Sequence, residues 1–389
     1  LSSVSVSGTT DLGANVTTSG TQTYTGAATV SGASILSTTN SSVGFGSTIT
    51  LGDNLTVSTG TGAGDITVAG TINGAKDLSL SAGTGAISLT GAVGGSTRVG
   101  AVSLNSTGAT TLSAAVKAAS VTTNAGGTLA INGASVDTAT GNQTYGEAIT
   151  LGADTTLTGS NINTQSTLAG GSHSLTIAGN ANIDGAYSGL SSVSVSGTTD
   201  LGANVTTTGA QTYTGATTLT AASMLTGSNI TMAAVALESN STAYQLTLAN
   251  TDSASVITGV ISGAGSLVKQ GAGTLTLSGN NTYSGTTNIT TGTLKIGHAS
   301  ALGAASSGTT VGANGVLDLN NLSVSEPVTV AGGKVINGVL AGDIALTADS
   351  AFEASAGSTL TLSGNISGSY GLTINGGGSI TLSGDNTYT

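Results

Sequence analysis

Residues 271–297 read GAGTLTLSGNNTYSGTTNITTGTLKIG, and this stretch decides the fold. Apolar side chains alternate with polar ones at Leu275 and Leu277, and again at Leu294 and Ile296. A period of two places the apolar side chains on one face of a β-strand and the polar ones on the other. Gly and Asn interrupt the runs every roughly five to ten residues, and both tolerate the positive φ angles of tight corners. The stretch therefore predicts short strands joined by sharp turns.

The composition of the whole chain agrees with this prediction. Only 6% of the 389 residues are charged, against about a quarter in ordinary globular proteins, which argues against an enzyme with a normal charged surface. Two Phe, eight Tyr and no Trp cannot fill the core of a large globule, yet 38% hydrophobic residues are too many for a disordered linker. Small aliphatic residues scattered among Thr, Ser, Asn and 62 Gly favour an all-β chain.

The charge balance and the missing residue types exclude several classes of protein. The net charge is −11, and six basic residues cannot neutralise a phosphate backbone, so we expect no nucleic-acid partner. No run of 18 apolar residues is present that would form a membrane-spanning helix. The absence of Cys removes disulfides and thiolate metal sites from consideration.

Internal repeats extend the pattern over most of the chain. Residues 1–40 recur as 190–229 with 30 identical positions out of 40. A shorter unit that begins Gln-Thr-Tyr occupies residues 22–40, 143–161 and 211–229. Repeats of this kind indicate a solenoid in which each supersecondary unit stacks on the next.

A second kind of repeat lies near the C-terminus, where residues 266–284 match residues 371–389 at an offset of 105. The offsets of the Gln-Thr-Tyr unit are 121 and 68. We interpret all three offsets as whole multiples of one coil of about 21–24 residues, which predicts roughly 18 coils. Because both chain ends fall inside repeats, we expect the chain to be an internal piece of a longer protein.

These repeats resemble two related families of bacterial exoproteins. The block GNQTYGEAITLGADTTLTGSN at 141–161 is similar to the repeats of filamentous-haemagglutinin-like proteins of two-partner secretion systems. The block LVKQGAGTLTLSGNNTYSGTTNITTGTLKIGHASALG at 267–303 resembles the passenger-associated transport repeat of autotransporters, a more specific motif. The resemblance implies a right-handed parallel β-helix that is secreted or displayed on the cell surface through an outer-membrane secretion pore.

The two kinds of repeat divide the chain. We assign residues 1–240 to a β-solenoid with Gln-Thr-Tyr repeats and residues 241–389 to a continuing β-solenoid with passenger-associated transport repeats at 266–297 and 371–389. Outward positions carry Thr and Ser, which suit strands and stay soluble without charge. Like charges stacked on neighbouring strands would repel, which explains the low charged fraction.

Carboxylates are the first candidates for catalysis, because β-helix polysaccharide hydrolases use clustered acids within about 5–10 Å. Asn250-Thr251-Asp252 is similar to one polygalacturonase motif, but the Asp-Asp, Gly-His-Gly and Arg-Ile-Lys partners are missing. We interpret Asp252 as a turn residue. A lyase would need a basic residue beside an acidic cluster, and Arg98 has no acidic neighbour in sequence.

Other candidates have equally plain interpretations. His173 and His298 each stand beside Ser, as surface or loop residues do. The segment 60–65, GTGAGD, is similar to one calcium-binding nonapeptide but does not recur in tandem. No nucleophile elbow or phosphate-binding loop is present. We therefore assign no catalytic residue, no cofactor-binding residue, no metal ligand and no small-molecule substrate.

One Tyr recurs at the same place in each repeat, at Tyr24, Tyr145, Tyr213, Tyr283 and Tyr388. These side chains form either an exposed binding stripe or the packing of equivalent corners, and we favour the corners. In the favoured interpretation each Tyr occupies the same place in its own coil.

The leading functional hypothesis is a structural and adhesive segment of a surface exoprotein, which is not an enzyme. Through its Thr/Ser-rich faces it would bind one of two partners. These are identical neighbouring chains, and a host or matrix surface made of glycan or protein. The alternatives are a self-assembling extracellular filament without a receptor, and a β-helix enzyme acting on polysaccharide. Ice binding through Thr-Leu-Thr arrays is weakened by their irregular spacing, at 156–158, 218–220, 274–276 and 359–361.

Overall fold

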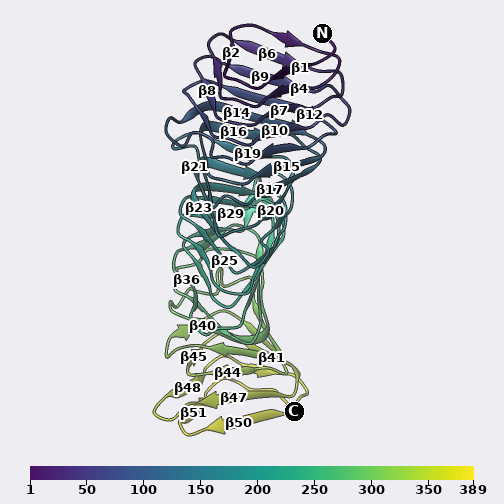
Figure 1. The fold of residues 1–389 in the computed structure, drawn as a ribbon. Helices are drawn as coiled ribbons and strands as arrows, with labels where there is room; N and C mark the ends of the chain where they lie inside the picture. The colour runs from purple at the N-terminus through teal and green to yellow at the C-terminus, as the bar shows by residue number, and fades with distance from the viewer. The chain divides into compact units, whose positions relative to one another are not determined.

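The computed structural model of the chain describes residues 1–389. All of its regular elements are β-strands, and no helix in it is long and apolar enough to cross a bilayer. The chain forms two compact units, Leu1–Gly197 and Thr198–Thr389. Within each unit, parallel coils stack on one another as a β-solenoid, with about 19 turns in all (Figure 1). The predicted all-β solenoid is confirmed.

Each coil of the first unit contributes short strands to three faces, and the strands pair in parallel from coil to coil. On one face the ladder passes from Ile72 to Val116 through the isolated bridges of Val93. The first face consists of β1 (Val4–Val6), β4 (Gln22–Tyr24), β7 (Val43–Phe45), β10 (Ile66–Val68), β13 (Ile87–Leu89), β15 (Ala109–Leu112), β17 (Thr128–Ile131), β20 (Ala148–Leu151), β22 (Leu168–Ala169) and β24 (Tyr187–Leu190). The second begins with β2 (Thr10–Leu12), β5 (Ala28–Val30), β8 (Ile49–Leu51) and β11 (Ile72–Asn73) and later includes β18 (Ser135–Asp137) and β25 (Ser192–Val195). The third face consists of β3 (Val16–Thr17), β6 (Ser34–Ser37), β9 (Leu55–Ser58), β12 (Leu78–Gly83), β14 (Val99–Ser106) and β19 (Gln143–Tyr145). Three long strands bend at the corner and contribute to both the second and the third face: β16 (Val116–Thr123), β21 (Thr155–Thr164) and β23 (Ser174–Ile183).

The second unit is built in the same way. One face consists of β26 (Thr199–Leu201), β29 (Thr217–Leu219), β32 (Val235–Ala236) and β37 (Ile261–Ser262). The next contains β27 (Val205–Thr207), β30 (Ser223–Gly227), β35 (Gln245–Asn250), β38 (Ser266–Gln270), β43 (Val328–Ala331), β46 (Ile344–Ala348) and β49 (Ile366–Ser367). The third contains β28 (Gln211–Tyr213), β31 (Ile230–Met232), β36 (Ser255–Ile257), β39 (Thr274–Leu277), β44 (Lys334–Ile336), β47 (Ser350–Ala354) and β50 (Leu372–Gly376). The long strands β40 (Thr287–Ile296) and β41 (Thr309–Asp318) contribute to both the second and the third face of this unit. A separate parallel sheet consists of β42 (Ser323–Val324), β45 (Gly338–Leu340), β48 (Thr359–Leu362) and β51 (Ser379–Leu382). The short hairpin of β33 (Glu238–Ser239) and β34 (Thr242–Ala243) is antiparallel.

The core of each unit is a set of ladders of small aliphatic side chains. In the first unit, Leu36, Val57 and Leu80 pair in successive coils, and all are buried. The stacked rings of Tyr24 and Phe45, with centroids 5.1 Å apart, continue the same principle with aromatic residues. Strands about 4.8 Å apart bring equivalent side chains into direct contact, so the alternation seen in the sequence becomes a continuous apolar interior.

Coil length varies more than the sequence predicted. Val328 pairs with Ile344, 16 residues later, whereas Val235 pairs with Ile261, 26 residues later. The predicted range of about 21–24 residues is therefore too narrow. The turns take up the difference, because insertions there leave the strand pairing intact.

The interpretation of the repeat offsets as whole numbers of coils is wrong within each unit. The strand positions that stack on Gln22 are Val43, Ile66, Ile87, Thr110, Leu129 and Ile149. Gln143 pairs with Val121 on another face instead. In the second unit the residues stacked on Leu267 in successive coils end at Ile366. Leu372, which corresponds to Leu267 in the repeat, pairs instead with Ser350 on the neighbouring face. The motifs recur at equivalent corners, but not on the same face.

Asn and Asp side chains hold the corners together. Asn54 Oδ1 accepts a hydrogen bond from the backbone N–H of Asp77 (2.9 Å), and Asp77 Oδ1 accepts one from the N–H of Ala101 (2.8 Å). Each bond satisfies a backbone donor of the next coil at a point where the strand ladder begins. The division at residue 240 by repeat type stays a prediction. The boundary between the two compact units falls in the sequence between residues 197 and 198.

Candidate functional site

The carboxylate that the sequence singled out lies in a turn. Asp252 is exposed, and its Oδ1 accepts a hydrogen bond from the N–H of Ser253 at 2.6 Å. The neighbouring Asn250 is buried, and its Nδ2 donates to the backbone oxygens of Asp252 (2.8 Å) and Thr274 (2.9 Å). Asn250 therefore joins two coils, and the Asn-Thr-Asp sequence serves a corner.

The two histidines occupy different settings. His173 Nδ1 lies 3.7 Å from Asp154 Oδ1, in the preceding coil, and that carboxylate also accepts a hydrogen bond from the N–H of Ser174. This backbone bond, with the nearby His173, lowers the pKa of Asp154. His298 Nδ1 accepts a hydrogen bond from the N–H of Ser300 within its own turn. Both residues lie outside the strands and are partly exposed, as the sequence predicted.

Arg98 has an acidic partner that the sequence did not reveal. Its Nη2 donates to Asp137 Oδ2 at 2.7 Å, and its Nη1 donates to the backbone oxygen of Ala118 at 2.9 Å. The guanidinium therefore connects three successive coils, and its hydrogen bond lowers the pKa of Asp137. Because the partner is 39 residues away, sequence proximity could not indicate it.

The segment 60–65 is occupied by contacts between coils. Asn40 Oδ1 accepts a hydrogen bond from the N–H of Gly62, and Asp65 Oδ1 accepts one from the N–H of Ala86. No cluster of three or more His, Cys, Asp or Glu side chains with metal-binding geometry occurs in the chain.

Four of the five repeat tyrosines are buried at corners: Tyr24, Tyr145, Tyr213 and Tyr283. Tyr388 in the last coil is partly exposed. Burial raises the pKa of Tyr145 and Tyr283. An exposed stripe of these four side chains is therefore wrong, and the corner interpretation is confirmed for them.

The glutamine of each Gln-Thr-Tyr unit is the residue that the sequence analysis missed. The Nε2 of Gln143 donates to the backbone oxygens of Val136 (3.0 Å) and Thr158 (2.8 Å), and its Oε1 accepts from the hydroxyl of Tyr145 (2.7 Å). Gln22 and Gln211 make the same set of bonds at their own corners. The spacing of two between Gln and Tyr was the available signal, because it places both side chains inside.

One lysine and two glutamates are buried without an opposite charge. Lys269 projects into the core, and its Nζ donates to the backbone oxygens of Gln270 (2.6 Å) and Gly271 (2.7 Å); burial lowers the pKa of Lys269 to about 8. Burial raises the pKa of Glu147 and of Glu326 to about 7. The Glu147 carboxylate has no hydrogen-bond partner, while Glu326 Oε1 accepts from the hydroxyl of Thr309 at 2.6 Å.

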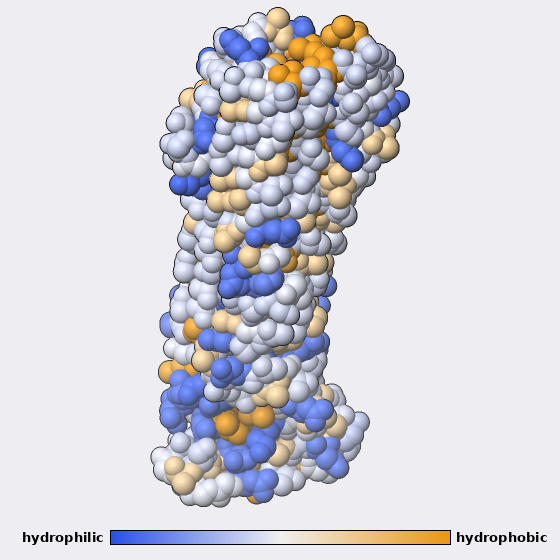
Figure 2. All heavy atoms as spheres, in the orientation of Figure 1, coloured by the Kyte–Doolittle hydropathy of each residue, from blue (hydrophilic) through white to orange (hydrophobic).

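The outer surface of the chain is mostly neutral. Figure 2 shows that most of the visible face is intermediate in hydropathy, with scattered hydrophilic residues. A few charged side chains pair across coils, as in the contact of 2.7 Å between Lys334 Nζ and Glu353 Oε2. Such a surface presents hydroxyl and amide groups rather than charge.

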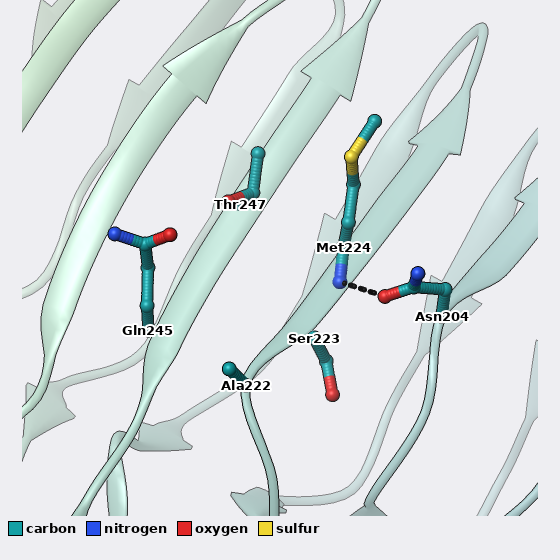
Figure 3. A pocket seen from close by; sticks show the side chains of 6 residues that line it. All are labelled: Asn204, Ala222, Ser223, Met224, Gln245 and Thr247. Carbon is teal, nitrogen blue, oxygen red and sulfur yellow. Dashed lines mark hydrogen bonds between the residues drawn. The ribbon is translucent and has the colours of Figure 1, made fainter.

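A hollow of about 150 Å³ opens on the outer surface of the second unit. Its lining residues come from the turn before β27 and from β30 and β35 with the turns before them: Asn204, Ala222, Ser223, Met224, Gln245 and Thr247. Figure 3 shows the side chains of these residues on neighbouring strands and on the turns before them, with Asn204 Oδ1 accepting a hydrogen bond from the N–H of Met224 at 2.8 Å. None of the lining side chains is charged, and we take this hollow as a candidate binding site.

A second hollow of about 150 Å³ lies in the same unit. Its lining includes Ser300, Val324, Ser325 and the buried Glu326. The wall is made mainly of small residues from the turns around residues 299–305.

Comparison with known proteins identifies repeats in the second unit. The family described as passenger-associated-transport-repeat matches residues 267–296 and 372–389. These matches confirm the resemblance to autotransporter passengers at the two places where the sequence predicted it. The resemblance of the Gln-Thr-Tyr units to filamentous haemagglutinins stays a prediction.

One curated relative is the Adhesin BmaC autotransporter of Brucella suis biovar 1 (strain 1330). It is 37% identical over 141 residues, which is 35% of this chain and 4% of that protein. The chain thus spans a small part of the length of the relative. No solved structure matches the chain.

Proposed function

We propose that the chain is an adhesive and structural segment of an autotransporter-type passenger, displayed at or released from the bacterial surface, and that it performs no catalysis. The observation that carries the proposal is the placement of passenger-associated transport repeats in a β-solenoid. The similarity to a protein described as an adhesin supports the same function. The solenoid would extend the passenger, and its hydroxyl- and amide-rich faces would contact a host or matrix surface.

Adhesion can be tested with the chain itself, coupled to fluorescent beads through one added Cys, because the native sequence contains none. We expect the beads to adhere to epithelial monolayers above the level of albumin-coated beads, and free chain to compete with them. Adhesion equal to the albumin control would contradict the proposed function.

The filament hypothesis makes a different prediction for the same material. Neutral Thr/Ser faces offer little charge repulsion between chains, so ordered side-by-side association is the outcome that this hypothesis requires. Electron microscopy of the purified chain distinguishes the two: regular fibres without bead adhesion favour the filament, and adhesion by monomeric chain favours the adhesin.

A further inference from the structure

The hollow at Asn204 carries free hydrogen-bonding groups beside apolar ones. The structure gives no protein hydrogen-bond partner to Asn204 Nδ2 or to the hydroxyl of Thr247, and Gln245 makes one long contact of 3.5 Å to Ser266. The thioether of Met224 and the methyl of Ala222 lie among these groups. Amides and a hydroxyl next to a small apolar surface match a sugar ring, which has hydroxyls at its edge and C–H groups on its face.

The internal repeat shows which part of this arrangement is structural. In the first unit Asn15 Oδ1 accepts a hydrogen bond from the N–H of Ile35 at 2.9 Å, as Asn204 does from Met224. This bond to the next coil is therefore common to both copies. It uses the oxygen of the amide and leaves the Nδ2 of Asn204 available.

The two copies of the repeat differ on the side of the hollow that Gln245 of β35 forms. The strand pairing places Gln245 beside Ala222, and it places Asn54 beside Ala33 in the first copy. Asn54 Oδ1 already accepts from the N–H of Asp77. Gln245 instead follows the hairpin β33–β34, is exposed and has no such bond, so it can serve a ligand.

We propose that this hollow binds a neutral sugar residue of a glycan chain, with the amides of Asn204 and Gln245 and the hydroxyl of Thr247 as hydrogen-bonding groups and Met224 against the ring. The proposal rests on the adhesive function proposed above and names its ligand class. The neutral lining distinguishes this site from one for uronate or phosphate, because it supplies no cation to an anionic ligand.

The chain has two methionines, which provide a direct measurement. Met224 lines the hollow, whereas Met232 is fully buried in the core. With the methionine methyl groups labelled with ¹³C, NMR spectra of the intact chain would be followed during titration with cellohexaose, mannohexaose and chitohexaose. We expect at least one of these to shift the Met224 resonance saturably and to leave Met232 unchanged.

Variants separate binding from folding. Asn204→Asp keeps the oxygen that accepts from the N–H of Met224 but removes the free amide donor. Gln245→Ala removes the second amide that lines the hollow. Each should weaken the saccharide at least about tenfold, an ordinary cost for losing a hydrogen bond to a ligand. Asn15→Asp makes the same change in the first copy and should leave binding unaltered.

Three results would overturn the proposal: no neutral hexasaccharide shifts Met224, hexagalacturonate shifts it equally well, or Asn204→Asp binds like the parent chain. The bead assay is independent of these results. Adhesion that persists in the Asn204→Asp variant, together with an unresponsive Met224, would reject the hollow and retain the adhesin. Saccharide binding without bead adhesion would retain the hollow as a sugar site and reject the adhesive function.

Discussion

Individual buried polar residues fix the corners of the coils. Gln143 is fully buried and uses both ends of its amide, toward Val136 and Thr158 on one side and Tyr145 on the other. Removing such a group leaves the buried Tyr145 hydroxyl without its partner and takes one hydrogen bond from each of two backbone oxygens, of which Thr158 O keeps the bond from the N–H of Thr138. An unsatisfied buried group costs about 1–3 kcal/mol.

Gln143→Ala should therefore lower the free energy of unfolding of the chain by about 2–4 kcal/mol. The exposed Gln245→Ala is the matched control and should change it by less than about 0.5 kcal/mol. Urea unfolding followed by circular dichroism measures both. Equal stability of the two variants would show that the corner amide contributes nothing.

The alternation of apolar and polar residues in the sequence predicts most of the apolar core. It does not identify the polar side chains that are buried in the core, such as Gln143 and Lys269. Lys269 lies two residues after Leu267, and that spacing alone places it inside. Composition argues against an inward lysine, because burying an ammonium is costly. The bonds from Lys269 Nζ to turn carbonyls offset part of that cost, and they depend on a three-dimensional corner that composition cannot show.

At the scale of the element, the close stacking of turns decides which side chains a corner accepts. Gly141 is an example, because a Cβ there would overlap the backbone oxygen of Ala119 in the preceding coil. Backbone atoms in a stacked sheet cannot move aside without disturbing the ladder. Gly8, in the turn after β1, has no atom within 4 Å of the position that a Cβ would take.

Gly141→Ala should destabilise the first unit by about 2 kcal/mol or more, whereas Gly8→Ala should be nearly neutral. Thermal unfolding of the two variants gives the comparison directly. A neutral Gly141→Ala would mean that adjacent coils separate more easily than the strand pairing indicates.

Pairs between coils were not predictable from the sequence. Arg98 and Asp137 meet because the two coil lengths that separate them have particular values, and coil lengths in the chain range widely. The hollow at Asn204 depends in the same way on the hairpin β33–β34, which interrupts the repeat. Strand existence follows from local alternation, whereas these sites follow from the number of residues in each turn.

At the scale of the whole molecule, two buried glutamates make stability depend on pH. The folded-state pKa values of Glu147 and Glu326 are raised to about 7, above the ordinary value of about 4.3. Both groups are protonated in folded and unfolded chains at low pH, so neither is penalised there. Between about pH 4.3 and 7 the unfolded chain releases these protons first, and stability falls as pH rises.

The Tm of the chain should therefore be higher at pH 5 than at pH 8, with up to about 3 kcal/mol lost per glutamate. In the double variant Glu147→Gln/Glu326→Gln the difference should shrink. The variant Asp11→Asn/Asp200→Asn removes two exposed charges and serves as the control for net charge. A similar change in both double variants would assign the effect to net charge alone.

The displacement of the Gln-Thr-Tyr motif from one face to another has an evolutionary consequence. Since Gln22 and Gln143 close different corners with the same bonds, the corners are interchangeable as folding units. A gene segment copied from one corner to the next can join its parent without encoding a full turn. Such a lineage can lengthen by fractions of a turn, and each duplication rotates the copied surface to a new direction around the axis of its unit.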